Sequence, residues 1–72
     1  MDNKITKSFG KRLKELRIEK GLSIERLAEE VGIGKSSISR WENAQAYVYA
    51  IYVVRLAQYF NVSVDYLLGL EN

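Results

Sequence analysis

The sequence contains no cysteine and no histidine. Without cysteine the chain can form neither a disulfide framework nor a thiolate metal site, and an oxidising compartment is not implied. Without histidine, Ser36, Ser37 and Ser39 have no candidate general base, and no glycine-rich loop that would cradle a phosphate is present. The neighbouring carboxylates Glu29 and Glu30 would point about 100° apart on a helix and would not converge. We therefore expect no enzymatic activity, no small-molecule substrate, and neither a metal ion nor another cofactor.

Long apolar runs are missing as well. No N-terminal stretch resembles a signal peptide, and no segment approaches the roughly 20 apolar residues needed to span a bilayer. We expect a cytoplasmic protein without a membrane partner. At 72 residues the chain is one domain, near the lower limit for a self-supporting core.

The chain carries almost no excess of either charge, and its net charge is only +2. The distribution is nevertheless uneven: residues 1–40 have ten Lys or Arg against six acids, a balance of +4, and residues 41–72 have a balance of −2. This polarity is compatible with a small DNA-binding protein, and equally with an ordinary solvated surface.

Apolar residues at helical spacing, bounded by capping and stop residues, predict five helices and no sheet. The first covers residues 5–20, and its expected inward side chains are Phe9, Leu13, Leu16 and Ile18. The second follows a Ser23 cap and ends at Gly32. The third covers residues 35–42, the fourth covers 49–60 and stops at Asn61, and the last lies between Ser63 and Gly69. The predicted fold is all-α: a compact five-helix domain over residues 5–69, with a flexible N-terminal arm at 1–4 and a tail at 70–72.

The second and third predicted helices are separated by little more than one glycine and its neighbours. Helices joined so closely cannot lie antiparallel, so they must cross steeply, as in a helix-turn-helix. The third helix begins with a basic residue and small hydroxyls, a combination that suits the DNA major groove. Sequence-specific DNA binding is the leading interpretation, although short basic helices are often simply solvated.

Residues 44–54, AQAYVYAIYVV, are ambiguous. They are rich in Tyr, Val and Ile and contain no charge, Pro or Gly, which taken alone favours a strand and resembles an aggregation-prone segment. We predict a loop followed by helix, because Leu56, Ala57 and Phe60 continue a helical face.

Three segments together resemble the phage-repressor (Cro/Xre-like) helix-turn-helix family, whose fold is lambda-repressor-like: FGKRLKELRIEKGLS, LAEEVGIGKSSISRWEN and LAQYFNVSVDYLLG. The similarity runs from about residue 9 to residue 69. It implies a transcriptional regulator, most often a dimeric repressor, whose third helix lies in the major groove of double-stranded DNA.

The resemblance assigns base contacts to Lys35, Ser36, Ser37 and Arg40. Their chemistry is consistent with this, since Lys and Arg can donate to guanine O6 and N7 and the hydroxyls can reach bases or phosphates. Contacts with the DNA backbone are expected from the hydroxyl of Ser39, from helix-terminal positions and from basic residues of the first two helices: Ile24, Asn43, Lys11, Lys14 and Arg26.

The resemblance also pairs Arg17 with Glu42, in a partly buried bridge that would fix the third helix against the first. The alternative is a coincidental exposed pair that contributes roughly 0–1 kcal/mol. Trp41 shares the inward face with Ile38, so we expect it in the core and not stacked on bases.

Two positions depart from the family pattern. Ile24 stands where many members have a glutamine that supports the reading helix and touches a phosphate, so only its backbone N–H can serve DNA here. After Glu42 the family commonly has Asn-Gly, basic residues and a proline, whereas this chain has Asn43, Ala44 and no basic residue before Arg55. Ala44 lacks glycine's tolerance of positive φ, and the missing cations remove expected phosphate contacts.

The segment after this loop concentrates apolar and aromatic residues at positions that are ordinarily polar in the fourth helix of the family that the chain resembles. We expect a homodimer interface there, formed by Tyr47, Val48, Tyr49, Ile51 and Tyr52. A two-fold dimer would place its reading helices about 34 Å apart, matching a pseudo-palindromic operator. Alternatively, the tyrosines fold onto their own core. A second functional hypothesis is a protein-interaction module that uses this tyrosine-rich surface to bind another protein.

Overall fold

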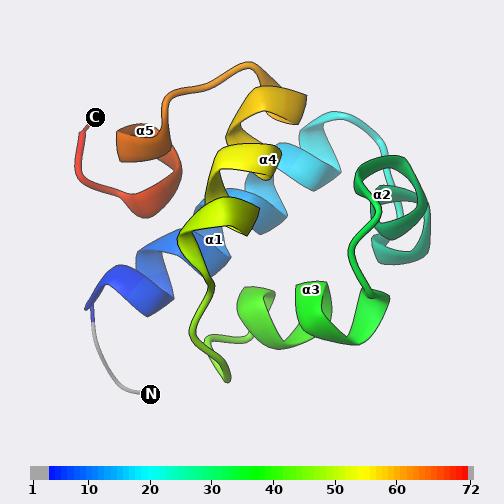
Figure 1. Cartoon of the computed structure of the whole chain (residues 1–72), viewed down its shortest axis with the longest axis horizontal. Coiled ribbons are helices and arrows are strands. Elements are labelled where there is room, and N and C mark those ends of the chain that lie inside the picture. Colours follow the sequence, from blue (N-terminus) through cyan, green and yellow to red (C-terminus); the bar gives the residue numbers. More distant parts are fainter. Residues whose placement is uncertain (1–3, 72) are drawn as a thin grey trace.

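The computed structural model describes residues 4–71, which form five α-helices and no strand (Figure 1). The helices are α1 (Lys4–Glu19), α2 (Ile24–Val31), α3 (Lys35–Glu42), α4 (Ala50–Phe60) and α5 (Val64–Leu68). The predicted all-α five-helix fold is thus confirmed. No helix within residues 4–71 is long and apolar enough to cross a membrane.

The ends of the chain differ from the prediction in one respect. Lys4, assigned to a flexible arm, is the first residue of α1. Residues 1–3 of that arm, and Asn72 of the predicted tail, lie outside the described residues.

Side-chain caps and left-handed residues set the helix limits where local sequence signals predict them. The hydroxyls of Ser23 and Ser63 each accept a hydrogen bond of 2.9 Å from a backbone N–H in the following turn. Asn61 ends α4 in the left-handed region at φ 57°. The fourth helix begins at Ala50, one residue after the predicted start, because Tyr49 is extended and serves as its N-cap.

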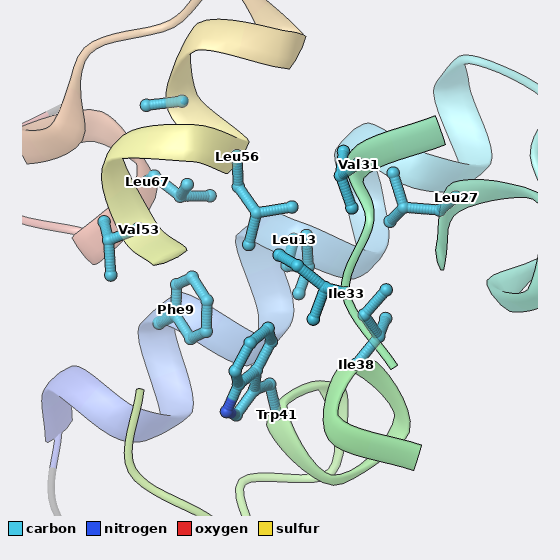
Figure 2. Close-up of a cluster of buried hydrophobic side chains, with 11 residues drawn as sticks. Phe9, Leu13, Leu27, Val31, Ile33, Ile38, Trp41, Val53, Leu56 and Leu67 are labelled. Carbon is cyan, nitrogen blue, oxygen red and sulfur yellow. The ribbon is translucent and has the colours of Figure 1, made fainter. Parts of the chain in front are cut away.

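The core forms where all five helices meet (Figure 2). Each helix contributes one leucine or isoleucine that is fully buried: Leu13, Leu27, Ile38, Leu56 and Leu67. Trp41 is also buried, as predicted, and its ring meets the Phe9 ring edge-on with 5.9 Å between centroids. This contact couples α3 to α1.

The prediction that Ile18 faces the core is wrong, because 58% of the residue is exposed. Arg17 takes the inward direction in the last turn of α1, where it reaches Glu42 of α3. Consecutive helical residues point about 100° apart, so Ile18 is turned to solvent.

A glycine in the middle of α1 permits the close approach of α3. A Cβ at Gly10 would overlap the carbonyl oxygen of Trp41 and lie 3.2 Å from that of Glu42. Both neighbours are backbone atoms at the end of α3. The distance between α1 and α3 therefore depends on the absence of a side chain at position 10.

Candidate nucleic-acid interface

A three-residue turn joins α2 to α3 and sets their steep crossing (Figure 1). Gly32 adopts φ 69°, and its N–H donates to the carbonyl of Ala28 at 2.9 Å. Ile33 follows and inserts its side chain into the core, where only 6% of it is exposed. The chain thus leaves α2, buries Ile33 in the core and begins α3 at Lys35. The Ile33 side chain therefore holds the end of α2 and the start of α3 against the same core.

The two faces of α3 differ sharply. Ile38 and Trp41 are buried, whereas Lys35, Ser36 and Arg40 are exposed. Of the remaining predicted contact residues, Ser37 and Ser39 are half-buried. The outward face of α3 therefore presents two cations and a hydroxyl in two turns of helix, a composition able to donate to the acceptors of a major groove.

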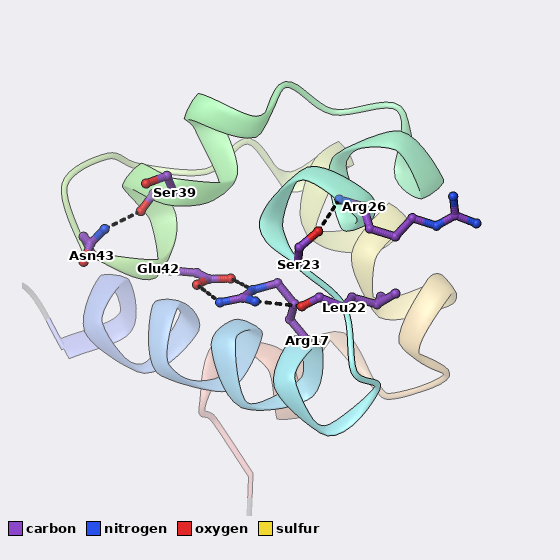
Figure 3. A network of polar contacts seen from close by, with 7 residues as sticks. All are labelled: Arg17, Leu22, Ser23, Arg26, Ser39, Glu42 and Asn43. Carbon is purple, nitrogen blue, oxygen red and sulfur yellow. Dashed lines mark hydrogen bonds and ion pairs between the residues drawn. The ribbon is translucent and has the colours of Figure 1, made fainter.

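The bridge between Arg17 and Glu42 fixes α3 on α1 (Figure 3). The guanidinium Nε and Nη2 donate to the two carboxylate oxygens at 2.7 and 3.0 Å, and only 12% and 4% of the two side chains are exposed. Arg17 Nη1 also donates to the Leu22 carbonyl at 2.8 Å, immediately before the Ser23 cap of α2. The hydrogen bonding that Arg17 donates to the Glu42 carboxylate raises the pKa of Arg17 against the opposing effect of burial. One side chain therefore connects α1, α3 and the start of α2.

The cations expected to contact the DNA backbone lie in different surroundings. Lys11 and Lys14 are exposed on α1. Arg26 of α2 forms ion pairs with Glu30 at 3.0 Å and Glu29 at 3.7 Å. A phosphate would have to compete with these two carboxylates for the Arg26 guanidinium.

The loop after α3 adopts a strained conformation. The amide of Asn43 donates to the Ser39 carbonyl at 2.8 Å and thereby caps its own helix (Figure 3). Ala44 follows at φ 56°, in the left-handed region that costs a non-glycine residue about 1–2 kcal/mol. The backbone thus keeps the turn that a glycine would form at this position, although the residue is alanine.

Replacing Ala44 by glycine should raise the free energy of unfolding by about 0.5–1 kcal/mol. The left-handed strain is removed, and the greater entropy of glycine in the unfolded chain offsets part of the gain. Urea unfolding followed by circular dichroism measures the change. Ala46→Gly is the matched control in the same loop, at a residue without positive φ, and should lower stability instead. Equal effects of the two substitutions would contradict strain at Ala44.

The tyrosine-rich segment divides between core and surface. Trp41 Nε1 donates to the Tyr47 carbonyl at 3.2 Å, and the Tyr52 ring lies 5.8 Å from the Trp41 ring. Val48 and Tyr52 are half-buried against the core, whereas 65% of Tyr47, 77% of Tyr49 and 65% of Ile51 are exposed. The expectation that the tyrosines fold onto their own core therefore holds for Tyr52 and not for Tyr47 or Tyr49, and the homodimer interface stays a prediction.

A groove of about 590 Å³ lies beside these exposed residues. The first turns of α1 and the loop before α4 form part of it, and α4 and α5 complete it. Its lining is predominantly apolar and includes Ile5, Phe9, Val48, Val54 and Leu68. Apolar surface thus continues from the exposed tyrosines into a concave region.

Two features of the site were not predicted from the sequence. The Lys35 ammonium lies 3.4 Å from a carboxylate oxygen of Glu25 in the first turn of α2. Arg55 donates to the Val31 carbonyl at 3.4 Å and lies over the Tyr52 ring. The contacts of Lys35 with Glu25 and of Arg55 with Val31 join residues at least ten positions apart on different helices, a separation that leaves no periodic signal in the sequence.

Comparisons with known proteins agree with this geometry. The chain is 43% identical over 64 residues to the uncharacterized HTH-type transcriptional regulator YobD and 39% identical over 62 residues to the HTH-type transcriptional regulator ImmR, both of Bacillus subtilis. It is 33% identical over 63 residues to the HTH-type transcriptional activator BcrR of Enterococcus faecalis. These matches cover 89%, 86% and 88% of this chain but only 57%, 49% and 31% of the three relatives.

A solved structure matches more completely. The restriction-modification controller protein C.AhdI of Aeromonas hydrophila is 35% identical, with a TM-score of 0.78 over 86% of this chain and 94% of that one. A family model described as a helix-turn-helix domain matches residues 10–72. The chain therefore belongs to the helix-turn-helix family, as its resemblance to the phage-repressor-like regulators predicts.

Proposed function

We propose that this protein binds a specific double-stranded DNA sequence through α3 in the major groove and thereby regulates transcription. The observation that carries the proposal is the exposed face of α3, with Lys35, Ser36 and Arg40 opposite the buried Ile38 and Trp41. The matched relatives are named as transcriptional regulators, which supports the same conclusion. The matched relatives come from bacteria, in which a DNA-binding regulator acts in the cytoplasm, and we propose the same location for this protein.

The proposed contact residues form two groups, one that contacts the bases and one that contacts the DNA backbone. Lys35 and Arg40 donate to guanine O6 and N7, while Ser36 and Ser37 contact bases or nearby phosphates. Backbone contacts come from Ser39, from the N–H groups at Ile24, and from Asn43, Lys11, Lys14 and Arg26. Asn43 and Arg26 already have intramolecular partners, so a phosphate would bind their remaining N–H groups or compete with those partners.

We infer repression as the mode of regulation. Repression by operator occupancy requires only that the protein remain bound where polymerase must bind, whereas activation needs an additional productive contact with polymerase. One matched relative is named an activator. Transcription from a promoter that overlaps the selected site, with and without the protein, tests the direction.

Replacing Arg40 by alanine should weaken specific binding by about 1–3 kcal/mol and relax the preference at one base position. The reason is the loss of a bidentate donor to one guanine. Selection from a random duplex pool, followed by affinity measurements on the selected duplex, provides both readouts. Arg12→Ala is the charge-matched control, since the Arg12 guanidinium lies over the Tyr66 ring on the α5 side of α1. An Arg40→Ala protein that selects an unchanged motif would rule out base contact by Arg40.

We further propose a homodimer that binds a pseudo-palindromic operator, with an interface centred on Tyr47, Tyr49 and Ile51. These side chains are exposed, and Val48 and Tyr52 support them from the core side. The adjacent apolar groove extends the surface that a second copy would cover. Aromatic residues on a surface of this kind are typical of interface centres.

Replacing Ile51 by glutamate should shift the protein to monomer at high micromolar concentration, because a charge would be buried at the interface. Size-exclusion chromatography with light scattering measures the mass. Ile18→Glu is the matched control, since Ile18 is similarly exposed on α1 away from this surface. A wild-type protein that is monomeric at that concentration would contradict the dimer.

The same exposed tyrosines favour a second candidate function, a protein-interaction module in which this surface binds a different protein. Binding to a random duplex pool at low salt separates the two functions. Competitor-resistant retention of particular sequences supports DNA recognition. Salt-sensitive binding of all sequences alike supports the interaction module.

A further inference from the structure

The two cations on the exposed face of α3 differ in their electrostatic surroundings. Lys35 Nζ lies 3.4 Å from Glu25 Oε2, and about two thirds or more of each side chain is exposed. Arg40 has no carboxylate within 4 Å among the residues that the structure describes. Glu25 is thus an acidic residue placed beside a predicted base-contacting cation, on a surface that must approach a polyanion.

The fold does not need this ion pair. Exposed pairs contribute little to stability because water and salt screen the attraction. The Arg17–Glu42 bridge, by contrast, is largely buried and already holds α3 in place. The consequence of this ion pair should therefore appear in binding and not in folding.

A phosphate and a guanine would compete differently with Glu25 for the Lys35 ammonium. Contact with a phosphate brings a full negative charge toward the carboxylate, and juxtaposed like charges are costly in an interface. A guanine presents neutral acceptors, and an ammonium has three protons, so Lys35 can keep Glu25 and still donate to a base. The carboxylate could also accept from cytosine N4, which lies beside guanine O6 in the same base pair.

We propose that Glu25 is a positioning residue that determines specificity by restricting Lys35 to base contacts and disfavouring contact with phosphate. This inference rests on the proposed DNA-binding function and extends it. In this inference, Glu25 weakens binding to every DNA sequence that offers Lys35 no base to contact. A binding protein gains specificity by such repulsive elements as well as by attractive ones.

The test compares Glu25→Gln with wild type on two probes. One probe is the duplex that the wild-type protein selects from a random pool, and the other is a scrambled duplex of the same length and composition. We expect Glu25→Gln to bind the scrambled duplex about three- to tenfold more tightly, with a smaller gain on the selected duplex, so that the specificity ratio falls. The salt dependence on the scrambled duplex should steepen by about 0.9 if Lys35 gains one phosphate contact.

Two controls separate this effect from a general loss of negative charge. Glu29→Gln removes the same charge from α2, but Glu29 pairs with Arg26 and not with Lys35, so its specificity ratio should stay within about twofold of wild type. In a Lys35→Gln background, Glu25→Gln should also change the ratio less than about twofold, because coupled residues are not additive. Thermal unfolding by circular dichroism should show that all variants remain folded.

The following results would overturn the inference about Glu25. Equal ratios for Glu25→Gln and wild type overturn the inference while the proposed function stands. A full Glu25→Gln effect in the Lys35→Gln background, or an equal effect of Glu29→Gln, also overturns it, because Glu25 would not be acting through Lys35. A wild-type protein that selects no duplex at all overturns the proposed function and the inference together.

Discussion

Arg17→Met is expected to lower the free energy of unfolding by about 3–5 kcal/mol. The Glu42 carboxylate would lose both hydrogen bonds from the guanidinium and stay buried without a partner charge. A domain of this size usually gains only about 3–5 kcal/mol from its core, so much of the variant should be unfolded at 25 °C. Urea unfolding monitored by circular dichroism gives the difference directly.

Two comparisons isolate the buried charge as the cause. Arg26→Met breaks an exposed pair with Glu30 and should cost less than about 1 kcal/mol. The double variant Arg17→Met with Glu42→Leu removes both charges and should recover most of the lost stability. If Arg17→Met alone unfolds within about 1 kcal/mol of wild type, the bridge does not stabilise the domain.

Gly10→Ala should have the second large effect, a loss of about 2 kcal/mol. Alanine is favoured over glycine inside a helix by about 1 kcal/mol, so propensity alone would predict a gain. The added Cβ, however, meets the backbone carbonyls of Trp41 and Glu42, which cannot rotate away as a side chain could. Overpacking of this kind typically costs 1–3 kcal/mol, more where the backbone must move, and we expect it to exceed the propensity gain.

Gly34→Ser provides the control for Gly10→Ala. A Cβ at position 34 has nothing within 4 Å, and Gly34 is an N-cap without a side-chain hydrogen bond. Serine there should raise stability by a few tenths of a kcal/mol. Thermal unfolding of both variants measures the contrast, and a Gly10→Ala protein as stable as wild type would show that α1 and α3 can separate without cost.

Local signals account for the part of the fold that was predicted correctly. Ser23, Gly32, Ser63 and Gly69 are residues whose own chemistry starts or stops a helix, so the sequence contains the information within a few positions. The third helix and the inward direction of Trp41 follow from spacing alone. The limits of the second, third and fifth helices were therefore accurate.

Errors occurred where the outcome depends on a partner distant in sequence. Whether Arg17 or Ile18 points inward is decided by Glu42, 25 positions away, and helical spacing does not distinguish between them. The tyrosine-rich segment divides between core and surface because Trp41 donates a hydrogen bond to the Tyr47 carbonyl and its ring lies against that of Tyr52. Composition does not distinguish these tyrosines from one another, although the fold packs one against the core and exposes the others.

For the candidate site, the resemblance to the phage-repressor-like family predicted more than the spacing of the residues did. Spacing shows that Lys35 and Arg40 lie on a short basic helix, but many such helices contact only water. The pairing of Arg17 with Glu42 also came from the resemblance. The ion pair between Glu25 and Lys35 came from neither, because it joins two helices through long side chains ten positions apart.

Trp41 gives the protein an optical reporter of its own. It is the only tryptophan in the chain, and its indole is buried between the Phe9 ring of α1 and the Tyr52 ring of α4 while holding the loop through Tyr47. Loss of any of these three contacts would admit water to the indole and shift its emission to longer wavelength. Fluorescence without an added label can therefore follow the seating of α3 during folding and DNA binding.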